Sequence, residues 1–217
     1  MRIHVGCGMN VLDGFVNIDN SPTVLLSRLP LPLLRLLKTA GIVNAAQWNF
    51  SQNLKHGGKK LVYANCLRLP FPDGSVDYCY TSHMLGWCLS HNQIHAFLKE
   101  LHRVLKPGGA LRLSFFDFDL LVEEYRQQRD TIRFSEQMPM GIREFNFRDK
   151  LKFLFSSNMQ NGLILNRETI SRLLEQYGFR DITVLSAGET TFTPEQIGAT
   201  DLFQRQGESV YIECATL

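Results

Sequence analysis

Residues 2–8 read RIHVGCG and residues 16–19 read VNID, and these two short segments decide the fold. Both contain the branched apolar residues of a short strand. The first segment ends in glycines, which let the backbone turn tightly and approach a ligand because they carry no Cβ. The second ends on Asp19, whose carboxylate can accept hydrogen bonds from both hydroxyls of a ribose. Together they predict a nucleotide-type ligand at the carboxyl edge of an open α/β sheet.

The rest of the chain alternates between strand and helix signals. Further strands are expected at residues 61–64, 77–81, 110–115, 182–185 and 210–214. Ser90 can cap one helix, with Gln93 in the capping-box position, and the KPGG segment at residues 106–109 stops it. Asn166 can cap a second helix, which Gly178 ends. This order predicts an α/β fold, with a mostly parallel sheet and helices on both faces.

Size and composition indicate one globular domain. The 217 residues are 44% hydrophobic and 20% charged, which is ordinary for a soluble globular protein. We therefore expect a single domain over residues 1–217, with insertions at about residues 20–60, 120–165 and 187–207. The formal net charge of +2 gives no general case for nucleic-acid binding.

The cysteines and histidines give no case for a disulfide or a metal. The cysteines are Cys7, Cys66, Cys79, Cys88 and Cys214. Their number is odd and none has C-x-x-C spacing, so we expect a reducing, cytoplasmic location. His91 and His95 have the spacing that can bind a metal on one helix face, but no third ligand is evident, and a solvated helix face is expected instead. No metal site is predicted.

Three strings in the first half of the chain resemble one enzyme family. They are LPFPDGSVD at residues 69–77, YTSHML at residues 80–85 and LHRVLKPGG at residues 101–109. They are similar to segments of class I S-adenosylmethionine-dependent methyltransferases of the type 11 kind, from residue 2 to about 117 and weakly beyond. Within that class the chain resembles small enzymes of polysaccharide or glycolipid pathways. The resemblance implies S-adenosylmethionine as cofactor and a Rossmann-like, seven-stranded sheet with an antiparallel last strand.

The resemblance also assigns the cofactor contacts. They fall on Gly6, Cys7, Gly8, Asp19, Asn65, Cys66, Ser82 and His83. The glycine turn would pass the methionine part of the cofactor, and Asp19 would hold the ribose. Asn65 stands where the family has an aspartate near the adenine amine, and its carbonyl oxygen can accept from that amine as well. Ser82 and His83 would lie beside the sulfonium.

The chain departs from the family pattern at three positions. His4 replaces an acid two residues before the first glycine, and Gly86-Trp87 replaces Glu-His. No helix-forming stretch precedes Arg2, so we expect an insertion or another subunit to close the site. These departures motivate an alternative function, a cofactor-binding protein without transferase activity that acts as a regulatory or scaffolding subunit.

Two residues are candidates for the base that an oxygen acceptor requires. His83 titrates near neutrality and faces the transfer site by analogy, although it could equally fix its loop by hydrogen bonds. Asp117 follows the strand at residues 110–115 and is either a second base or a helix N-cap. The expected reaction is methyl transfer to a small molecule or a glycan or glycolipid hydroxyl. The sequence does not identify the acceptor.

Residues 22–38 form a leucine-rich, basic segment without a single acid. Pro30 and Pro32 rule out one long helix through it. The segment either contacts a membrane surface or a lipid-linked acceptor, or packs as a short helix over the sheet or at a homodimer contact. Because it directly follows Asp19, we expect residues 20–45 to form part of the active-site rim, and replacing Leu33, Leu34 and Leu37 by serine to impair that rim.

Overall fold

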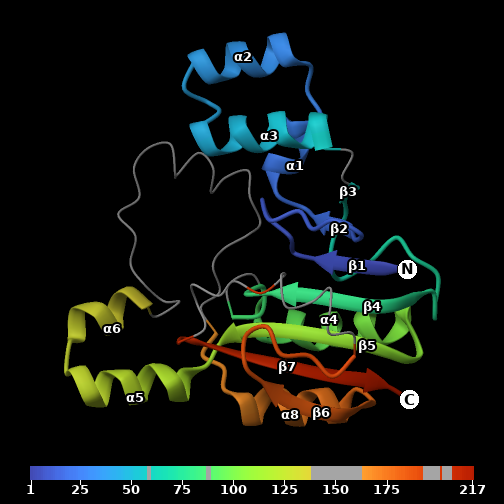
Figure 1. Ribbon diagram of the computed structural model, residues 1–217, viewed down its shortest axis with the longest axis vertical. Coiled ribbons are helices and arrows are strands. Elements are labelled where there is room, and N and C mark those ends of the chain that lie inside the picture. Colours follow the sequence, from blue (N-terminus) through green and yellow to red (C-terminus); the bar gives the residue numbers. More distant parts are fainter. Residues whose placement is uncertain (58–59, 87–88, 138–162, 193–200, 202–206) are drawn as a thin grey trace.

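The computed structural model describes residues 1–57, 60–86, 89–137, 163–192, 201 and 207–217. Its strands form one sheet of order β3-β2-β1-β4-β5-β7-β6 (Figure 1). They are β1 (Arg2–Val5), β2 (Val16–Asp19), β3 (Leu61–Tyr63), β4 (Val76–Ser82), β5 (Leu105–Phe116), β6 (Phe179–Leu185) and β7 (Ser209–Thr216). The pairs from β3 to β5 are parallel, and β7 runs antiparallel to both β5 and β6. The predicted α/β fold, with a mostly parallel seven-stranded sheet and an antiparallel last strand, and all seven predicted strands are confirmed.

Two of the helices begin at the caps that the sequence predicted. They are α1 (Pro22–Ser27), α2 (Leu31–Thr39), α3 (Ala45–Gly57), α4 (His91–Val104), α5 (Phe118–Gln128), α6 (Thr131–Gln137) and α8 (Arg167–Gln176). At the start of α4 the Gln93 side chain accepts from the Ser90 backbone N–H at 2.8 Å. At the start of α8 the Asn166 side chain accepts from the Thr169 N–H at 3.0 Å. Both predicted caps are therefore confirmed.

One face of the sheet is apolar and is covered by α4 and α8. The predicted stripe of α4 is buried at Ile94, Phe97, Leu98, Leu101 and Val104. It packs in one cluster with strand residues such as Ile3, Leu111 and Ile212 and with the buried positions of α8. This cluster is the main hydrophobic core, and it fixes the strands whose ends form the site.

The opposite face of the sheet, here called the polar face, combines a small apolar cluster around Tyr78 and Tyr80 with buried polar and charged side chains. His4, Asn17, Arg112 and Glu213 are all at most 1% exposed. Residues 6–15, which connect the parallel strands β1 and β2, contain turns and no helix. That is uncommon, since a parallel connection usually contains a crossover helix. The loop is instead held by the Asn17 side chain. Its Oδ1 accepts from the Leu12 N–H at 2.8 Å and from His4 Nδ1–H at 3.3 Å, and its Nδ2 donates to the Leu12 carbonyl at 3.0 Å.

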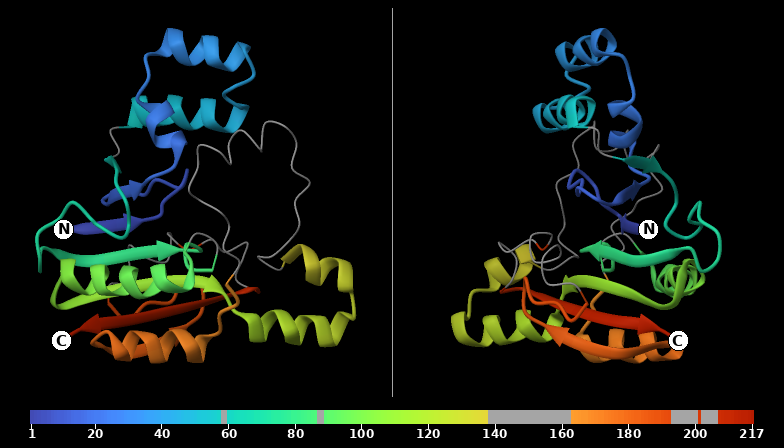
Figure 2. Two further views of the ribbon diagram at one scale, coloured as in Figure 1. Left: turned by 180° about the vertical axis from the view of Figure 1, so that it is seen from behind. Right: turned by 45° about the vertical axis from the view of Figure 1, so that its right-hand side comes forward.

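Helices α1, α2 and α3 lie beyond the β2–β3 edge of the sheet in both views of Figure 2. Val24, Leu34, Val43 and Phe50 are buried in this part of the chain. These helices occupy the expected insertion at residues 20–60. Of the other two expected insertions, residues 138–162, 193–200 and 202–206 lie outside the described residues. The division into one domain with these insertions stays a prediction.

Arg103 gives the LPFPDGSVD and LHRVLKPGG strings a structural role. Its guanidinium donates to both Glu100 oxygens at 2.8 and 2.7 Å and to the carbonyls of Leu69 and Phe71 at 3.3 and 3.0 Å. An ion pair to Asp73 completes the set. The loop before β4 is thus fastened to helix α4, next to the start of β4.

Candidate cofactor and acceptor site

A cavity of about 240 Å³ lies at the carboxyl ends of β1, β2 and β4, beside the start of α4. Of the eight predicted cofactor contacts, six line this cavity: Gly6, Asp19, Asn65, Cys66, Ser82 and His83. Cys7 and Gly8 belong to the same turn but are not in the lining. The structure therefore brings together residues that are up to 77 positions apart in the sequence, from Gly6 to His83.

The glycine turn is tied to the end of β2. The backbone N–H groups of Gly6 and Cys7 both donate to the Ile18 carbonyl, at 2.9 and 3.1 Å. Gly6 has a φ of +70°, and a Cβ there would lie 2.6 Å from Met84 Sδ. Only glycine fits this position without movement of Met84. Burial raises the pKa of the Cys7 thiol to about 12, so this cysteine is a packed core group rather than a reactive thiol.

Asp19 holds the turn and also faces the cavity. One carboxylate oxygen accepts from the Gly8 N–H at 2.8 Å, and the other accepts from the Ser21 N–H at 2.7 Å. A carboxylate oxygen has about two lone-pair sites, so each oxygen keeps capacity for a ligand hydroxyl. The protein partners fix the carboxylate in one orientation before any ligand binds.

The residues present fit S-adenosylmethionine. Asp19 supplies acceptors for ribose hydroxyls, and Val5, Ile18 and Leu67 supply apolar walls. The Asn65 carbonyl oxygen accepts from the Leu67 N–H at 2.9 Å and retains one lone pair for an adenine amine. Gly6 leaves the turn without a side chain next to the cavity.

Ser82 and His83 are fixed by the neighbouring strands. The Ser114 hydroxyl of β5 donates to Ser82 Oγ at 2.9 Å, and the His83 N–H donates to the Ser114 carbonyl at 2.8 Å. His83 has a φ of +52°, a left-handed conformation that few non-glycine residues adopt. Its ring lies 4.7 Å from the ring of Phe116, and its Nε2 is 3.3 Å from Ser209 Oγ. Strained backbone held by several contacts is typical of functional positions.

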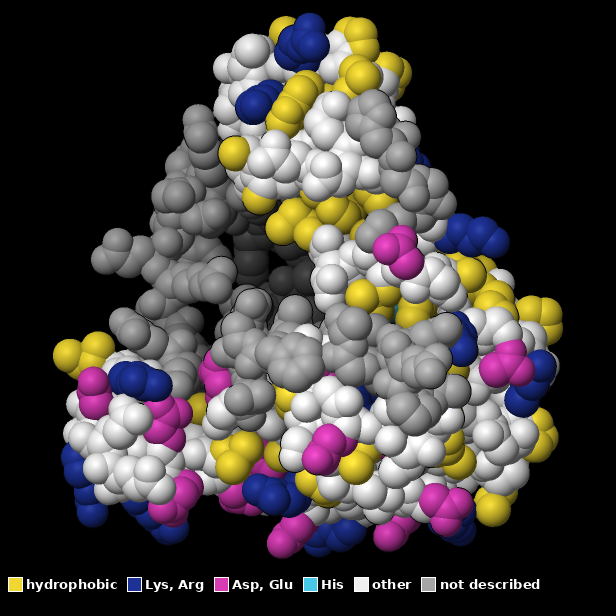
Figure 3. All heavy atoms as spheres, in the orientation of Figure 1, with side chains coloured by type: hydrophobic (Ala, Val, Ile, Leu, Met, Phe, Trp, Pro, Cys, Tyr) yellow, Lys and Arg dark blue, Asp and Glu magenta, His cyan; other side chains and the backbone are white. Residues whose placement is uncertain are grey.

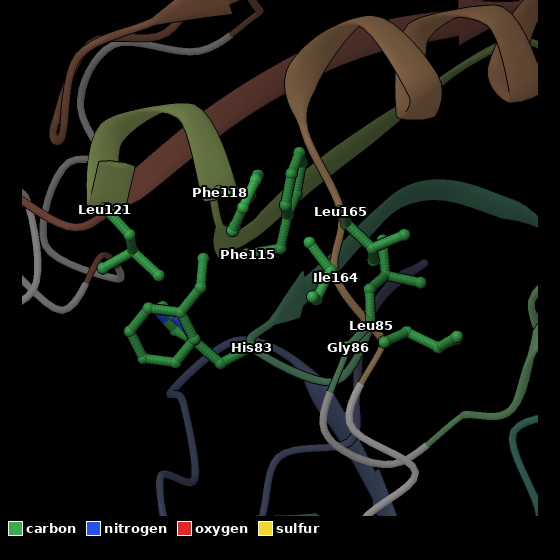
Figure 4. A pocket seen from close by; sticks show the side chains of 10 residues that line it. His83, Leu85, Gly86, Phe115, Phe118, Leu121, Ile164 and Leu165 are labelled. Atoms are coloured by element: carbon green, nitrogen blue, oxygen red, sulfur yellow. The ribbon is translucent and has the colours of Figure 1, made fainter. Parts of the chain in front are cut away.

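A second, apolar pocket adjoins the first at His83. Figure 4 shows it among the side chains of Phe115, Phe118, Leu121 and Leu165. Its volume is about 10 Å³, which is room for one group the size of a water or a methyl. His83 lines both this pocket and the larger cavity.

Gly86 shapes the apolar pocket. It has a φ of +40°, and a Cβ there would approach the Leu163 carbonyl to 3.2 Å. The Leu163 N–H in turn donates to the Gly86 carbonyl at 3.2 Å. Because residues 163–165 pack this closely, the glycine in place of the family's glutamate has a structural reason. Trp87, the other departure, lies outside the described residues.

Asp117 is buried and caps helix α5. One of its oxygens accepts from the Asp119 N–H at 2.9 Å, and the other accepts from Arg167 Nε at 3.2 Å. The N-cap interpretation is therefore confirmed. The Asp117 side chain lines neither pocket, whereas His83 lines both.

His4 lies on the polar face of the sheet and does not line the cavity. Its ring contacts Tyr80 at 5.0 Å, and burial lowers its pKa to about 4. The departure at this position therefore places a neutral, packed imidazole behind the turn.

The predicted surface histidines are also explained by packing. His95 Nδ1 hydrogen-bonds the Tyr177 hydroxyl at 2.9 Å, and its ring lies 5.0 Å from that of His91. In the part of the chain that the structure describes, no three histidine, cysteine or acidic side chains gather as a metal site would require.

The sequence interpretation missed several lining residues. Met84, Leu89 and Gln93 all line the larger cavity. Met84 directly follows a predicted contact, so extending that motif by one residue would have found it, whereas Leu89 and Gln93 lie just before and within the start of α4. The expected rim is limited to Asn20 and Ser21, because α2 lines neither pocket.

The serine test at Leu33, Leu34 and Leu37 also needs correction. Leu34 is 0% exposed in the core between the helices, so its replacement tests stability instead of a rim.

Comparisons with known proteins agree with this geometry. A family model described as a methyltransferase domain matches residues 35–113. A ubiquinone/menaquinone biosynthesis C-methyltransferase of Vibrio cholerae is 32% identical over 128 residues, 58% of this chain and 46% of that protein. A demethylmenaquinone methyltransferase of Staphylococcus epidermidis is 30% identical over 152 residues, 64% of this chain and 58% of that protein. The chain thus spans about half the length of the curated relatives it matches.

Two solved structures share the fold. A methyltransferase of Thermotoga maritima, titled a possible histamine N-methyltransferase, has a TM-score of 0.51 and 17% identity, covering 100% of this chain and 82% of that one. A methyltransferase of Methanosarcina mazei has a TM-score of 0.50 and 19% identity, covering 100% and 92%.

Residues 35–113 are thus similar to a methyltransferase domain, and the whole chain has the fold of the class I, S-adenosylmethionine-dependent enzymes. The relatives reported above are named for quinone methylation, not for polysaccharide or glycolipid pathways.

Proposed function

We propose that this protein transfers the methyl group of S-adenosylmethionine to a small-molecule acceptor. The observation that carries the proposal is that His83 lines both the cofactor-sized cavity and the apolar pocket beside it. Methyl transfer is an in-line displacement, so donor and acceptor must meet from opposite sides of one point. A residue shared by two adjoining pockets marks such a point.

S-adenosylmethionine, when bound, supplies an already activated methyl group. Asp19, Asn65 and the turn at Gly6 bind and orient it in the larger cavity, with Cys66 and Ser82 beside them. His83 orients the acceptor and accepts its proton. The contact of His83 Nε2 with Ser209 Oγ, at 3.3 Å, holds the ring in place for this proton transfer.

The apolar pocket favours an acceptor with an apolar group beside the reacting atom. Its lining is mainly phenylalanine, leucine and isoleucine. An amphipathic molecule, such as a phenol, a quinol or a glycolipid, meets this requirement better than a bare sugar. Transfer to a hydroxyl oxygen is the primary proposal. Transfer to a ring carbon is the second candidate, supported by the names of the quinone C-methyltransferases that the chain resembles.

The alternative is a cofactor-binding subunit without transfer. It is motivated by the small volume of the apolar pocket, which accepts little more than a methyl group in this conformation. The two functions predict the same cofactor affinity and differ only in turnover.

The test is a two-step measurement. Calorimetry with S-adenosylhomocysteine is expected to show binding to one site. Incubation with isotope-labelled S-adenosylmethionine and a panel of reduced demethylmenaquinone, simple phenols and glycolipids is expected to label one class. NMR of the product separates an O-methyl from a C-methyl group.

Variants locate the proton transfer. For an oxygen acceptor, His83→Gln should lower kcat at least about 100-fold with little change in cofactor affinity, as expected for the loss of a general base. His91→Gln is the matched control, because His91 lies on α4 and lines neither pocket. Absence of cofactor binding would reject the proposal. Binding without turnover on any acceptor would favour the subunit alternative.

A further inference from the structure

Helices α1 and α2 carry a cluster of exposed apolar and basic side chains that the methyl-transfer site does not use. We call it the basic leucine surface, and it consists of Leu25, Arg28, Leu31, Leu33, Arg35, Leu36 and Ile42. Five of the twelve large hydrophobic residues that are exposed in the described part of the chain lie here, with Leu36 and Ile42 each 63% exposed. Figure 3 shows hydrophobic side chains beside Lys and Arg side chains over α2, at the top of the molecule.

These exposed leucines do not belong to the apolar contact of α2 with the rest of the protein. The inner side of α2 already packs through Leu34, which is 0% exposed, and Val43 beyond the helix is 2% exposed. Lys38 lies 4.7 Å from the centre of the Trp48 ring on α3, which closes another part of the helix contact. The outward apolar groups therefore remain in water although α2 already buries Leu34 on its inner side.

The charge of the segment is one-sided. Residues 20–72 contain seven Lys and Arg residues and no Asp or Glu, in a chain whose formal net charge is only +2. Arg28 and Arg35 form no ion pair within the described residues. An apolar strip flanked by unneutralised cations is complementary to a surface that is both apolar and anionic.

We propose that the basic leucine surface docks the protein on an anionic phospholipid bilayer, with α2 lying in the interface. Its leucines enter the boundary between headgroups and acyl chains, and Arg28 and Arg35 contact the lipid phosphates. A second copy of this chain is a poorer occupant, because it would place the same cations opposite one another. Attachment is peripheral, since no helix in the described residues is long and apolar enough to cross a bilayer.

Sedimentation with lipid vesicles tests this proposal without cofactor or acceptor, so its failure is distinct from failure of methyl transfer. The protein should sediment with vesicles that contain phosphatidylglycerol and remain in solution with pure phosphatidylcholine vesicles. Binding should weaken as salt is raised, because exposed charges are screened. Equal binding to both kinds of vesicle, or to neither, would overturn the proposal.

Paired variants separate the two components. Arg28→Gln with Arg35→Gln should weaken partitioning about 25-fold, roughly fivefold for each cation lost near an anionic surface. Leu33→Ser with Leu36→Ser should weaken it about tenfold, because interfacial binding scales with the apolar area buried. Since these side chains are exposed, the variants should keep the melting temperature and cofactor affinity of the parent.

The controls carry the same chemistry elsewhere on the surface. Ile132→Ser removes a 73% exposed apolar group of α6, and Arg126→Gln removes a cation of α5 whose side chain is 68% exposed. Neither should change vesicle binding. Equal losses in the controls would show non-specific adsorption. A parent that forms dimers without lipid, and surface variants that are monomers by sedimentation velocity, would assign the surface to a second copy instead.

Discussion

The two faces of the central sheet are built by different means. The face beneath α4 and α8 is closed by interdigitating apolar side chains, among them Leu98, Leu111 and Leu174. Over the centre of the other face, Arg112 forms buried ion pairs with Asp201 and Glu213. Polar partners from turns and loops surround these charges, including the Gly188 N–H at 2.8 Å from Asp201 and the Thr191 N–H at 2.7 Å from Glu213.

The contrast shows how a parallel sheet can be closed where a connection contains no helix. A helix presents a ready apolar stripe, whereas a loop presents backbone groups that need hydrogen-bond partners when buried. Asn17 and Glu213 supply such partners from the sheet itself, to the backbone of Leu12 and of Thr191. The polar face therefore depends on charge and protonation, and the apolar face on volume.

The largest expected effect is the loss of the only cation of the buried cluster within the described residues. Arg112→Met leaves the carboxylates of Asp201 and Glu213 buried without a counter-charge, and should lower the free energy of unfolding by about 3–5 kcal/mol. Because those carboxylates become easier to bury when protonated, the loss should shrink in mild acid. Urea denaturation at several pH values measures both effects.

Leu98→Ala on the apolar face is the matched comparison. It should cost about 2–5 kcal/mol through the cavity it leaves, and that loss should not vary with pH. If the Arg112 and Leu98 losses respond to pH in the same way, the distinction between the faces is wrong.

His4 provides the next largest effect, also on the polar face. Burial lowers its pKa from the ordinary 6.5 to about 4, although the hydrogen bond with Asn17 acts in the other direction. Between about pH 4 and 6.5 the unfolded chain therefore binds a proton at His4 that the folded chain does not bind. The contribution of His4 to the free energy of unfolding is complete above pH 6.5 and is lost as the pH falls toward 4. Linkage gives a loss of about 2 kcal/mol near pH 5.

His4→Gln keeps an amide near Asn17 and removes the titration. The parent's loss of unfolding free energy between about pH 7.5 and 5 should exceed that of the variant by about 2 kcal/mol. Identical pH slopes would mean that His4 is solvated or protonated in the folded protein.

Local signals predicted more of this molecule than distant ones. The strands, the cap at Asn166 and the site residues Gly6, Asp19 and His83 follow from segments a few residues long, because their chemistry is set by neighbours in sequence. Arg112 and Glu213 are 101 residues apart and pair only through the antiparallel register of β5 and β7. No local pattern marks such a contact.

The apolar pocket escaped prediction for the same reason. It forms because residues 163–165 pack against the backbone of Gly86, 77 residues or more away in the sequence. The same contact explains why position 86 holds a glycine where the family has a glutamate. Asp117 is the opposite case, because its role depends on neighbours in the sequence. The sequence already offered the helix N-cap as one of its two roles, and the structure shows that cap at the start of α5.

Asp19 bonds the β1–β2 loop and also lines the cofactor cavity, so its replacement should change both stability and cofactor affinity. Asp19→Asn leaves one acceptor oxygen for two backbone donors and removes the charge. We expect affinity for S-adenosylhomocysteine to fall about tenfold, or about 1.4 kcal/mol, as charge-assisted bonds to the ribose are lost. Calorimetry measures this, and urea denaturation gives the accompanying change in stability. If the affinity for S-adenosylhomocysteine is unchanged and the free energy of unfolding is reduced, then Asp19 only holds the loop and does not bind the ligand.

The smallest expected effect concerns the first turn of that loop. Gly8 has a φ of +52° and open space at its Cβ position, and Gly74, in the loop before β4, has a φ of +57° and is equally open. Alanine at either position should cost about 1 kcal/mol of unfolding free energy, because both would hold a side chain in the left-handed region. Gly74 does not line the cavity, whereas the Gly8 N–H is bonded to Asp19 at its edge. Only Gly8→Ala should therefore also weaken S-adenosylhomocysteine binding. If Gly8→Ala and Gly74→Ala have equal affinities for S-adenosylhomocysteine, then Gly8 has only a structural role in the loop over the polar face. Gly6 would then be the glycine of the turn that ligand binding requires.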